Sequence, residues 1–576
     1  MPATTVPEVL TAWAADEPER RALVFLDERG DEQAALTYGD LHARALAMAR
    51  HLTERHVPGE RALLVFQPGL DVVVAYLGCL YAGVVAVPVA PPRRGRVSDA
   101  TRSIVRDCAP AVVLTVDAMR ETLAPLLAAT SGAPEALAAD RIADGARPTD
   151  EIPRACSVDD LAFLQYTSGS TSAPKGVMVS HGNLAANQEM IRTAFGHDRD
   201  STVVGWAPLF HDQGLIGNVL QPLWVGATTV LMSPTAFIRR PMSWLSAISR
   251  YRAHTSGGPD FAFGACIARA GDAPADLDLS CWEVAFDGAE PIRPSTLRRF
   301  AATFAPHGFR PAALFPCYGL AEATLLVTGS GKGRGPRTVA ADVGELERRR
   351  FVPARPGEGR VLAGSGAALP GEDLRIVDPA TRRPNPPGAV GEIWVSGAHV
   401  AQGYWRRPEA TADTFRARLE GADGDRAYLR TGDLGVVVDG EVHVVGRAKD
   451  MIIIRGRNHY PHDVEQTVRS AHPAVAAGTC AAFGVPGDAG ETLVVVAEID
   501  REHRHDDLGE VSAAIRATVV AEHEVALTEL VLTRWGTLSK TSSGKIMRAA
   551  TRRRHLEHGF DAMVPDPVDD RGGVRT

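Results

Sequence analysis

Short apolar runs rich in β-branched residues alternate with candidate helices over the first 330 residues of the chain. The apolar runs cover residues 61–66, 111–116, 161–167, 202–207, 227–232 and 282–288. Residues 181–195 and 240–254 are the clearest candidate helices between them. Because strands that alternate with helices usually build parallel sheets covered on their faces, this part of the chain is predicted to be α/β.

The pattern changes beyond about residue 370, where short strands are predicted at residues 373–378 and 391–397. In the stretch 435–446, Asp439-Gly440 lies between two β-rich arms and predicts a tight hairpin. A smaller α+β pattern follows, with strands expected at residues 479–485, 491–499 and 528–533. We therefore expect a large domain over residues 1–448 and a small one over 449–576, with a polar, mobile tail from about residue 557.

Residues 72–92 carry no charge and are long enough to cross a bilayer. However, Gly83 divides a helix-like piece from a β-branched run that ends in prolines. A helix followed by a buried strand explains the segment better than a membrane span. The N-terminus has no basic start followed by an apolar run, so no signal peptide is expected.

The composition is that of a globular enzyme, with 576 residues, 45% hydrophobic and 23% charged. A net charge of −8 gives no polyanion-binding signature, so nucleic acid is not an expected partner. The 7 cysteines are scattered without zinc-site spacing, which indicates reduced thiols and a cytoplasmic protein.

Lysine is rare, since the 62 basic residues include only Lys175, Lys332, Lys449, Lys540 and Lys545. Arginine evidently serves wherever a generic positive charge suffices. A retained lysine therefore indicates a place where a compact ammonium on a flexible stem is needed instead of a planar guanidinium.

The stretch Tyr166 to Gly176, "YTSGSTSAPKG", combines small hydroxyl residues, glycine and a lysine. Free backbone N–H groups, hydroxyls and an ammonium together suit phosphate oxygens. The pattern is not that of the Walker loop, and taken alone it also fits a Ser/Thr-rich linker. The candidate phosphate ligands are Thr167, Ser168, Gly169, Ser170, Thr171 and Lys175.

This stretch closely resembles the phosphate loop of the adenylate-forming superfamily, which includes acyl-CoA synthetases, peptide-synthetase adenylation domains, luciferases and fatty acyl-AMP ligases. The further motifs of that family follow in order: "DGAEPI" (287–292), "YGLAEAT" (318–324), "YLRTGDLG" (428–435), "GRAKD" (446–450) and "SSGK" (542–545). Each motif alone could be core, turn or surface, but six in the right order are not a coincidence. The resemblance implies two parallel-type α/β sheets with a small β subdomain, followed by a small mobile C-terminal domain.

The resemblance also implies roles for individual residues, with ATP and Mg2+ as cofactors. Gly288, Ala289 and Glu290 would form the adenine-binding turn, next to Gly319 and the stacking ring of Tyr318. Glu322 would hold magnesium together with Thr167. Asp433 would accept the ribose hydroxyls, Arg447 would contact ribose or phosphate, and Lys449 would be the hinge.

The same resemblance gives Lys545 the central chemical task. A carboxylate must attack the α-phosphorus of ATP, so two anions have to meet, and negative charge must be stabilised in the transition state. The ammonium of Lys545 would bridge both groups. Losing a charge so positioned typically costs about 100-fold to 1000-fold in rate.

Branch-specific stretches resemble the fatty acyl-AMP ligases. The segments around "PLFHDQGLIGN" (208–218) and "FAFGAC" (261–266) are mostly apolar or small, which suits an alkyl chain. They supply the candidate acyl-site residues His211, Gly214, Phe261 and Phe263, with His211 near the substrate carboxylate. An insertion at about 329–362, before a β-rich subdomain at about 363–446, is associated in those enzymes with blocking use of CoA. It could also be a solvent loop with "ELERRR" as an exposed helix face.

The sequence thus predicts a ligase that makes acyl-adenylate from a fatty acid and MgATP. It would then pass the acyl group to the phosphopantetheine of an acyl carrier protein in trans. An acyl-CoA synthetase and a catalytically silent nucleotide- and lipid-binding homologue remain as alternatives. Two departures from the family pattern, Ser172 and Ser539, stand where glycine and proline are usual and remove no group assigned to the chemistry.

Overall fold

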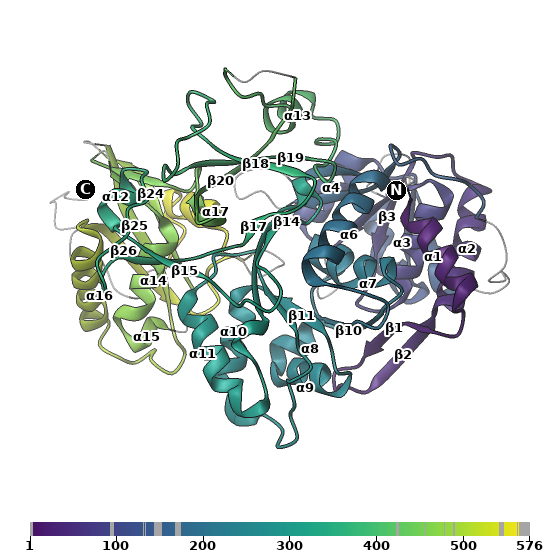
Figure 1. The fold of residues 1–576 in the computed structure, drawn as a ribbon, viewed down its shortest axis with the longest axis horizontal. Helices are drawn as coiled ribbons and strands as arrows, with labels where there is room; N and C mark the ends of the chain where they lie inside the picture. Colours follow the sequence, from purple (N-terminus) through teal and green to yellow (C-terminus); the bar gives the residue numbers. More distant parts are fainter. Residues whose placement is uncertain are drawn as a thin grey trace, which may run out of the picture.

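The structure is a computed structural model (Figure 1). It describes residues 4–92, 97–128, 130, 132, 134–142, 152–167, 174–421, 425–455, 457–476, 479–487, 490–540, 546–561 and 563. In Figure 1 the N-terminal part lies at the right, a β-rich subdomain at the top and the C-terminal part at the left.

The first sheet is built from the N-terminal third of the chain and ends at the predicted phosphate loop. Its strand order is β6(Glu135–Ala138)-β5(Val112–Thr115)-β3(Arg61–Val65)-β4(Val85–Val89)-β7(Leu161–Thr167)-β8(Lys175–Ser180). β6 to β7 are parallel, whereas β8 runs antiparallel to β7. The helices of this region are α1(Val6–Asp16), α2(Tyr38–Thr53), α3(Asp71–Ala82), α4(Asp99–Cys108), α5(Arg120–Ala128) and α6(His181–Phe195).

The second sheet brings together strands from both ends of the large domain. Its order is β17(Ala367–Ala368)-β14(Leu326–Gly329)-β13(Leu314–Gly319)-β12(Val284–Asp287)-β11(Thr255–Gly258)-β9(Thr202–Gly205)-β10(Thr228–Met232)-β1(Arg21–Leu26)-β2(Glu32–Thr37). The strands from β13 to β1 are parallel, so their carboxyl ends meet along one edge, where ligands bind in open α/β sheets. The nearby helices are α7(Gln221–Trp224), α8(Pro234–Arg239), α9(Met242–Arg250), α10(Asp260–Ala268) and α11(Pro294–Phe304).

A smaller antiparallel sheet follows, with the order β18(Glu372–Val377)-β19(Gly391–Gly397)-β20(Leu429–Val438)-β21(Glu441–Arg447). The predicted hairpin is confirmed, because Asp439 and Gly440 join β20 to β21 and both have positive φ, as a two-residue type I′ turn requires. The short helix α13(Pro408–Phe415) lies between β19 and β20 in the chain and is at the top of Figure 1.

The predicted insertion is more ordered than a solvent loop. Within it, β15(Thr338–Ala341) pairs with β16(Arg360–Ala363), and the short helix α12(Val343–Glu347) lies between these strands in the sequence. Leu346 and Glu347 are both buried, so one face of the "ELERRR" stretch packs inward. The alternative in which this stretch is simply an exposed helix face therefore does not hold.

The C-terminal part has its own apolar core around Val495, Ile515 and Leu532. Its elements are β22(Ile452–Ile454), β23(Arg457–His459), α14(Pro461–Ala471), α15(Pro473–Ala476), β24(Cys480–Gly487), β25(Gly490–Ile499), α16(Leu508–His523), β26(Leu527–Arg534) and α17(Arg548–Leu556). The expected tail beyond residue 557 starts as a docked segment, because Met563 N–H donates to Leu532 O at 2.8 Å. The prediction of a mobile tail falls, from residue 564 onwards, outside the described residues.

The uncharged segment 72–92 forms α3, a break at Gly83 and strand β4, as predicted. Gly83 ends the helix with φ 68°, a left-handed conformation that glycine adopts without steric cost. Nowhere in the described part of the chain is a helix both long enough and apolar enough to span a bilayer.

One local prediction was wrong in kind. No strand was predicted between residue 167 and the candidate helix at 181–195. Ser180 is indeed the N-cap of α6, but Lys175 to Ser180 form strand β8. Because β8 pairs with β7 through the register Thr167 to Lys175, the phosphate-loop motif is the connection of a β-hairpin.

Candidate active site

Three strands bring the predicted adenine-stacking tyrosine together with the two predicted ribose-binding residues. Tyr318 Oη donates a 2.8 Å hydrogen bond to Asp433 Oδ2, and Arg447 Nε donates to Oδ1 at 2.8 Å. Tyr318 is on β13, while Asp433 and Arg447 face each other across the β20–β21 ladder. Each carboxylate oxygen has two acceptor positions, so the Asp433 carboxylate keeps capacity for further donors such as hydroxyls.

Charge and burial keep the phenol of Tyr318 and the guanidinium of Arg447 protonated. Burial and the Asp433 carboxylate raise the pKa of Tyr318, so its phenol stays a donor. The same carboxylate raises the pKa of Arg447. Asp433 itself is 5% exposed, so its charge acts in a setting with little competing water.

The segment 399–404 binds both the backbone and the side chain of Glu322. Tyr404 Oη donates to Glu322 Oε1 at 2.8 Å, and Ala401 N–H donates to Glu322 O at 3.0 Å. Thr324, just after the turn, has φ 69° and ψ −63°, and its hydroxyl donates to His399 O at 2.6 Å. Since a positive φ is costly for a β-branched residue, this hydrogen bond fixes a strained turn beside Glu322.

The two ends of the phosphate-loop motif are described, but its centre is not. Thr167 ends β7 opposite Lys175, whose Nζ lies 4.6 Å from the centre of the Tyr404 ring. Tyr404 therefore contacts both Lys175 and Glu322. Ser168, Gly169, Ser170 and Thr171 lie outside the described residues.

The predicted adenine turn, residues 288–290, lies at the carboxyl end of β12. A Cβ at Gly288 would lie 2.9 Å from Cys317 Sγ, and a Cβ at Gly319 only 1.8 Å from Leu325 O, so neither position accepts a side chain. Ala289 adopts φ 70°, and Glu290 Oε1 accepts a 2.7 Å hydrogen bond from Phe261 N–H. The turn is thus tied to the start of α10, the helix that carries Phe261 and Phe263 of the predicted acyl site.

The four predicted acyl-site residues occupy different environments. Gly214 lies in a π-helical turn, Gln213–Leu220, where a Cβ would come within 2.1 Å of Pro208 O. His211 precedes this turn and contacts the Phe210 ring. Phe261 is half-buried beside Trp206, whereas Phe263 is fully buried in an aromatic core with Trp282 and Phe300. These positions favour Phe261 over Phe263 as a lining residue.

The C-terminal domain meets the insertion through a polar contact. Arg457 Nε donates to the buried Glu347 Oε2 at 2.5 Å, and Asn458 Nδ2 donates to Glu347 O at 2.5 Å. Nearby, Arg360 forms an ion pair with Asp463 at 2.9 Å. Sequence reasoning missed these contacts because nothing near Glu347 in the sequence indicates a partner beyond residue 450.

Lys449 lies in the turn after β21, close to the candidate site. Desolvation and the Arg447 guanidinium lower its pKa, while the Asp450, Asp433 and Glu322 carboxylates act in the opposite direction. Lys545 lies outside the described residues, whereas Lys540 is described and exposed. Lys332 pairs with Glu283 at 2.7 Å and lies 2.7 Å from His254 Nε2, so it anchors the start of the insertion at the amino ends of β11 and β12.

No group of three or more His, Cys, Asp and Glu side chains suited to a metal ion is found among the described residues. Magnesium, however, is usually held by one or two carboxylates together with substrate phosphates and water. The single carboxylate of Glu322, with the hydroxyl of Thr167, fits such a donor set.

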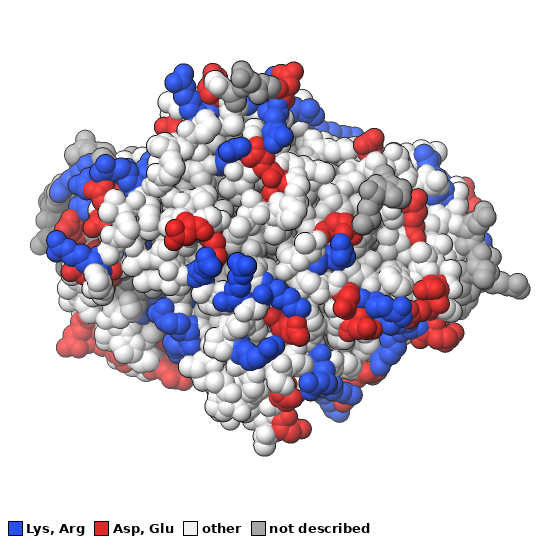
Figure 2. Space-filling model, in the orientation of Figure 1, with Lys and Arg blue, Asp and Glu red and all other residues white. Residues whose placement is uncertain are grey.

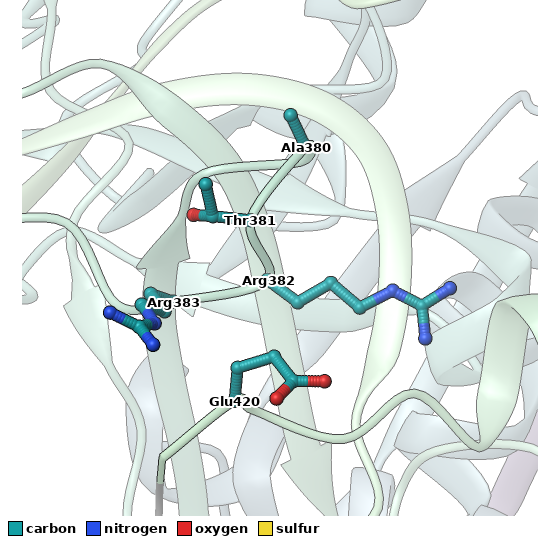
Figure 3. Close-up of a pocket in the computed structure, with 5 residues that line it drawn as sticks. All are labelled: Ala380, Thr381, Arg382, Arg383 and Glu420. Atoms are coloured by element: carbon teal, nitrogen blue, oxygen red, sulfur yellow. The ribbon is translucent and has the colours of Figure 1, made fainter.

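Other surface features do not coincide with these residues. An open hollow of about 450 Å³ lies on the β-rich subdomain. Ala380 to Arg383 and Glu420 line it (Figure 3). None of the predicted site residues lines it. Basic and acidic side chains are interspersed on the face in Figure 2, without a field of one sign.

The comparisons with known proteins cover both parts of the chain. The family model described as AMP-binding enzyme matches residues 10–405, and a second, Disco-interacting protein 2-like, AMP domain, matches residues 449–563. The medium-chain-fatty-acid–[acyl-carrier-protein] ligase JamA of Moorena producens is 41% identical over 97% of this chain and 96% of its own. The long-chain-fatty-acid–AMP ligase FadD26 of Mycobacterium marinum is 38% identical over 98% of this chain and 99% of its own.

A solved structure resembles the whole chain as well. It is the fatty acyl-adenylate ligase from L. pneumophila in complex with acyl adenylate and pyrophosphate. The TM-score is 0.75 at 37% sequence identity, and the match covers 96% of this chain and 97% of the other.

Proposed function

Since the chain belongs to the AMP-binding enzyme family, as one of its fatty acyl-AMP ligases, we propose that it activates a fatty acid with ATP and delivers the acyl group to an acyl carrier protein. The observation that carries the proposal is the convergence of Tyr318 and Arg447 on Asp433. This trio offers a buried, oriented carboxylate to the two ribose hydroxyls of a nucleotide.

In the first step a fatty-acid carboxylate oxygen attacks the α-phosphorus of ATP. A bond forms between that oxygen and phosphorus, the bond to the bridging oxygen breaks, and pyrophosphate leaves with its electron pair. Lys545 contributes an ammonium that draws the carboxylate and the α-phosphate together. Lys175, with Thr167 to Thr171, binds the phosphate oxygens.

Several further groups orient the nucleotide. Asp433 and Arg447 fix the ribose, while Tyr318, Gly319 and the turn from Gly288 to Glu290 hold the base. Glu322 and Thr167 would hold magnesium, which supplies positive charge to the phosphates when bound.

The acyl chain is bound next to the adenine turn. His211 and Gly214 lie at the entrance near the carboxylate, and Phe261 and Phe263 come from the helix that the Glu290 hydrogen bond joins to that turn. An apolar chain is selected by area and shape, so graded chain lengths will differ in affinity by increments of about 0.8 kcal/mol for each buried methylene.

In the second step the carrier thiol attacks the acyl carbonyl carbon, a thioester forms, and AMP leaves. The boundary near residue 448, with Lys449 as the hinge, allows the small domain to turn between the two steps. The contacts of Glu347 and Arg360 with that domain support a role of the insertion in restraining it, and so a preference for a carrier protein over CoA. The 7 unpaired cysteines support the cytoplasm as the location.

Fatty-acid-dependent exchange of pyrophosphate into ATP tests the first step. Exchange over a series of fatty acids is expected, with acyl transfer to carrier protein and little to CoA. No exchange with any acid would favour the silent homologue. Acyl-CoA formation as fast as adenylation would favour the acyl-CoA synthetase instead.

A further inference from the structure

Tyr404 is buried between two groups that the proposed function assigns to ATP and metal. Its hydroxyl donates to Glu322 Oε1 at 2.8 Å, and its ring lies 4.6 Å below the Lys175 ammonium. One side chain therefore contacts both the metal-binding carboxylate and the phosphate-binding lysine. Resting on that proposed function, we propose that Tyr404 is the positioning residue that sets the orientation of Glu322 towards the metal and of Lys175 towards the phosphates.

The backbone around Tyr404 is fixed by neighbours on two sides. On one side, Trp405 N–H donates to Gly176 O at 2.7 Å and Met178 N–H donates to Gly403 O at 2.8 Å, so this segment extends the sheet beyond β8. On the other side, Ala401 N–H donates to Glu322 O at 3.0 Å. The segment thus ties the exit of the phosphate loop to the turn that carries Glu322.

Helix α13 contacts both the backbone and the ring of Tyr404. Tyr404 N–H donates to Thr411 Oγ1 at 2.9 Å, and the Phe415 ring packs edge-on at 5.0 Å. The preceding Gly403 has φ 140°, and a Cβ there would lie 2.3 Å from Thr411 Cγ2. The ring is 7% exposed, so it has little freedom to turn away from its two partners.

The hydrogen bond to Glu322 restricts the orientation of the carboxylate and leaves most of its acceptor positions open. A carboxylate has about four acceptor positions over its two oxygens, and the phenol occupies one of them. A donor that orients a metal-binding carboxylate typically changes metal affinity by about 10-fold to 100-fold when it is removed.

The ring acts on Lys175 by a different interaction. An ammonium over the face of an aromatic ring is attracted by the negative π-surface, and the gain is larger where water is excluded. Lys175 is thereby held at the first position of β8, at the exit of the phosphate loop. The two contacts are chemically separable, because the hydroxyl serves Glu322 and the ring serves Lys175.

Two variants separate these roles. Tyr404→Phe removes only the hydroxyl, and Tyr404→Leu removes hydroxyl and ring. Tyr251→Phe is the matched control, because Tyr251 also donates to a carboxylate, Glu32 Oε1 at 2.7 Å, but at the exposed edge of the second sheet. Mn2+ binding to the enzyme with a non-hydrolysable ATP analogue is followed by electron paramagnetic resonance, and analogue binding without divalent metal by calorimetry.

Tyr404→Phe is expected to weaken Mn2+ binding about tenfold while leaving metal-free analogue binding within twofold of wild type. Its kcat should return towards that of wild type at saturating Mg2+, a recovery that general loosening of the fold would not give. Tyr404→Leu is expected to weaken metal-free analogue binding as well. Tyr251→Phe should match wild type in both measurements.

Unchanged Mn2+ binding in Tyr404→Phe overturns the inference, as does an equal loss of metal-free analogue binding in both Tyr404 variants. The Phe variant decides the question even if the Leu variant does not fold. Failure of the proposed function is seen separately, as a wild-type enzyme without fatty-acid-dependent pyrophosphate exchange. A wild-type enzyme that exchanges pyrophosphate, with a Tyr404→Phe variant that binds Mn2+ normally, contradicts only the role of Tyr404.

Discussion

Glu347 in the insertion and Arg457 in the C-terminal domain form an ion pair across the junction of the two parts, with Arg457 Nε 2.5 Å from Glu347 Oε2. The Glu347 side chain is only 6% exposed, and Arg457 is also bound by Glu524 at 2.7 Å. The pair combines a charge-assisted hydrogen bond with a buried carboxylate, although the Arg457 side chain itself is 38% exposed.

Removing the charge of Glu347 should loosen this junction. In Glu347→Gln we expect faster amide exchange in α12 and β23, since a hydrogen bond to a charged acceptor, worth about 1.5 to 3 kcal/mol, is replaced by a neutral one worth about 1 kcal/mol. Glu345→Gln is the matched control, because Glu345 lies on the same helix and its ion pairs within the described part of the chain are with Arg348 and Arg350 of the insertion itself. Equal exchange in both variants would show that the ion pair does not hold the domain.

Lys545→Ala should lower the rate of acyl-adenylate formation by about 100-fold to 1000-fold and leave ATP binding largely intact. The reason is that, in the proposed mechanism, the ammonium stabilises charge that develops in the transition state. Single-turnover adenylation and equilibrium ATP binding measure the two effects separately. Lys540→Ala, five residues earlier in the same stretch, is the control and should keep near-normal adenylation.

Asp433→Asn should raise the KM for ATP by about tenfold or more, because the charged acceptor for the ribose hydroxyls is lost and Arg447 loses its charged partner. The preference for ATP over 2′-deoxy-ATP should also shrink. The reason is that the variant binds the 2′-hydroxyl of ATP more weakly, so losing this hydroxyl costs it less. Asp439→Asn, in the hairpin turn of the same sheet, is the control. An unchanged preference for ATP over 2′-deoxy-ATP would contradict the assignment.

A buried acid–base pair, Glu372 and His399, predicts a pH effect on stability. Burial raises the pKa of Glu372 to about 8 from 4.5 and lowers that of His399 to about 4 from 6.5. Folded Glu372 keeps a proton that the unfolded chain has released, so its contribution falls as the pH rises from about 4.5 to about 8. The contribution of His399 falls in the other direction, as the pH drops from about 6.5 to about 4.

The two trends oppose each other below pH 6.5, and only that of Glu372 acts above it. We therefore expect the wild-type protein to lose stability between pH 6.5 and 8, by up to about 1.4 kcal/mol for each pH unit. Glu372→Gln should abolish that loss in thermal unfolding followed across this range. Glu358→Gln, at an exposed position of the insertion, should retain it.

Much of the fold could be predicted because strands buried on both faces appear in the sequence as continuous runs of apolar residues. Residues 161–167 and 391–397 were predicted with the bounds that β7 and β19 have. β8 was missed because its sequence, "KGVMVS", follows a loop motif so closely that its short apolar run was interpreted as loop. Its strand character comes from pairing with β7 on one side and with residues 403–405 on the other.

The sequence was enough to name candidate site residues where a motif carries its own chemistry, as at Asp433 and Glu322. The residues that orient these groups could not be named in this way, because their importance arises only from contacts across the chain. Tyr404 is 82 residues from Glu322, and Glu347 is 110 residues from Arg457. Such partners are set by topology, which local patterns of hydrophobic and charged residues do not contain.

The pairing of β8 on both of its sides also has a consequence for the order of events at the ribosome. β7 and β8 are synthesised early, yet the backbone groups on the outer side of β8 find their partners only when residues 403–405 have emerged. Until then this strand has an open edge beside a glycine- and serine-rich hairpin connection. We expect nascent chains that stop before residue 400 to expose this edge, and so to depend on chaperones more than chains that extend beyond it.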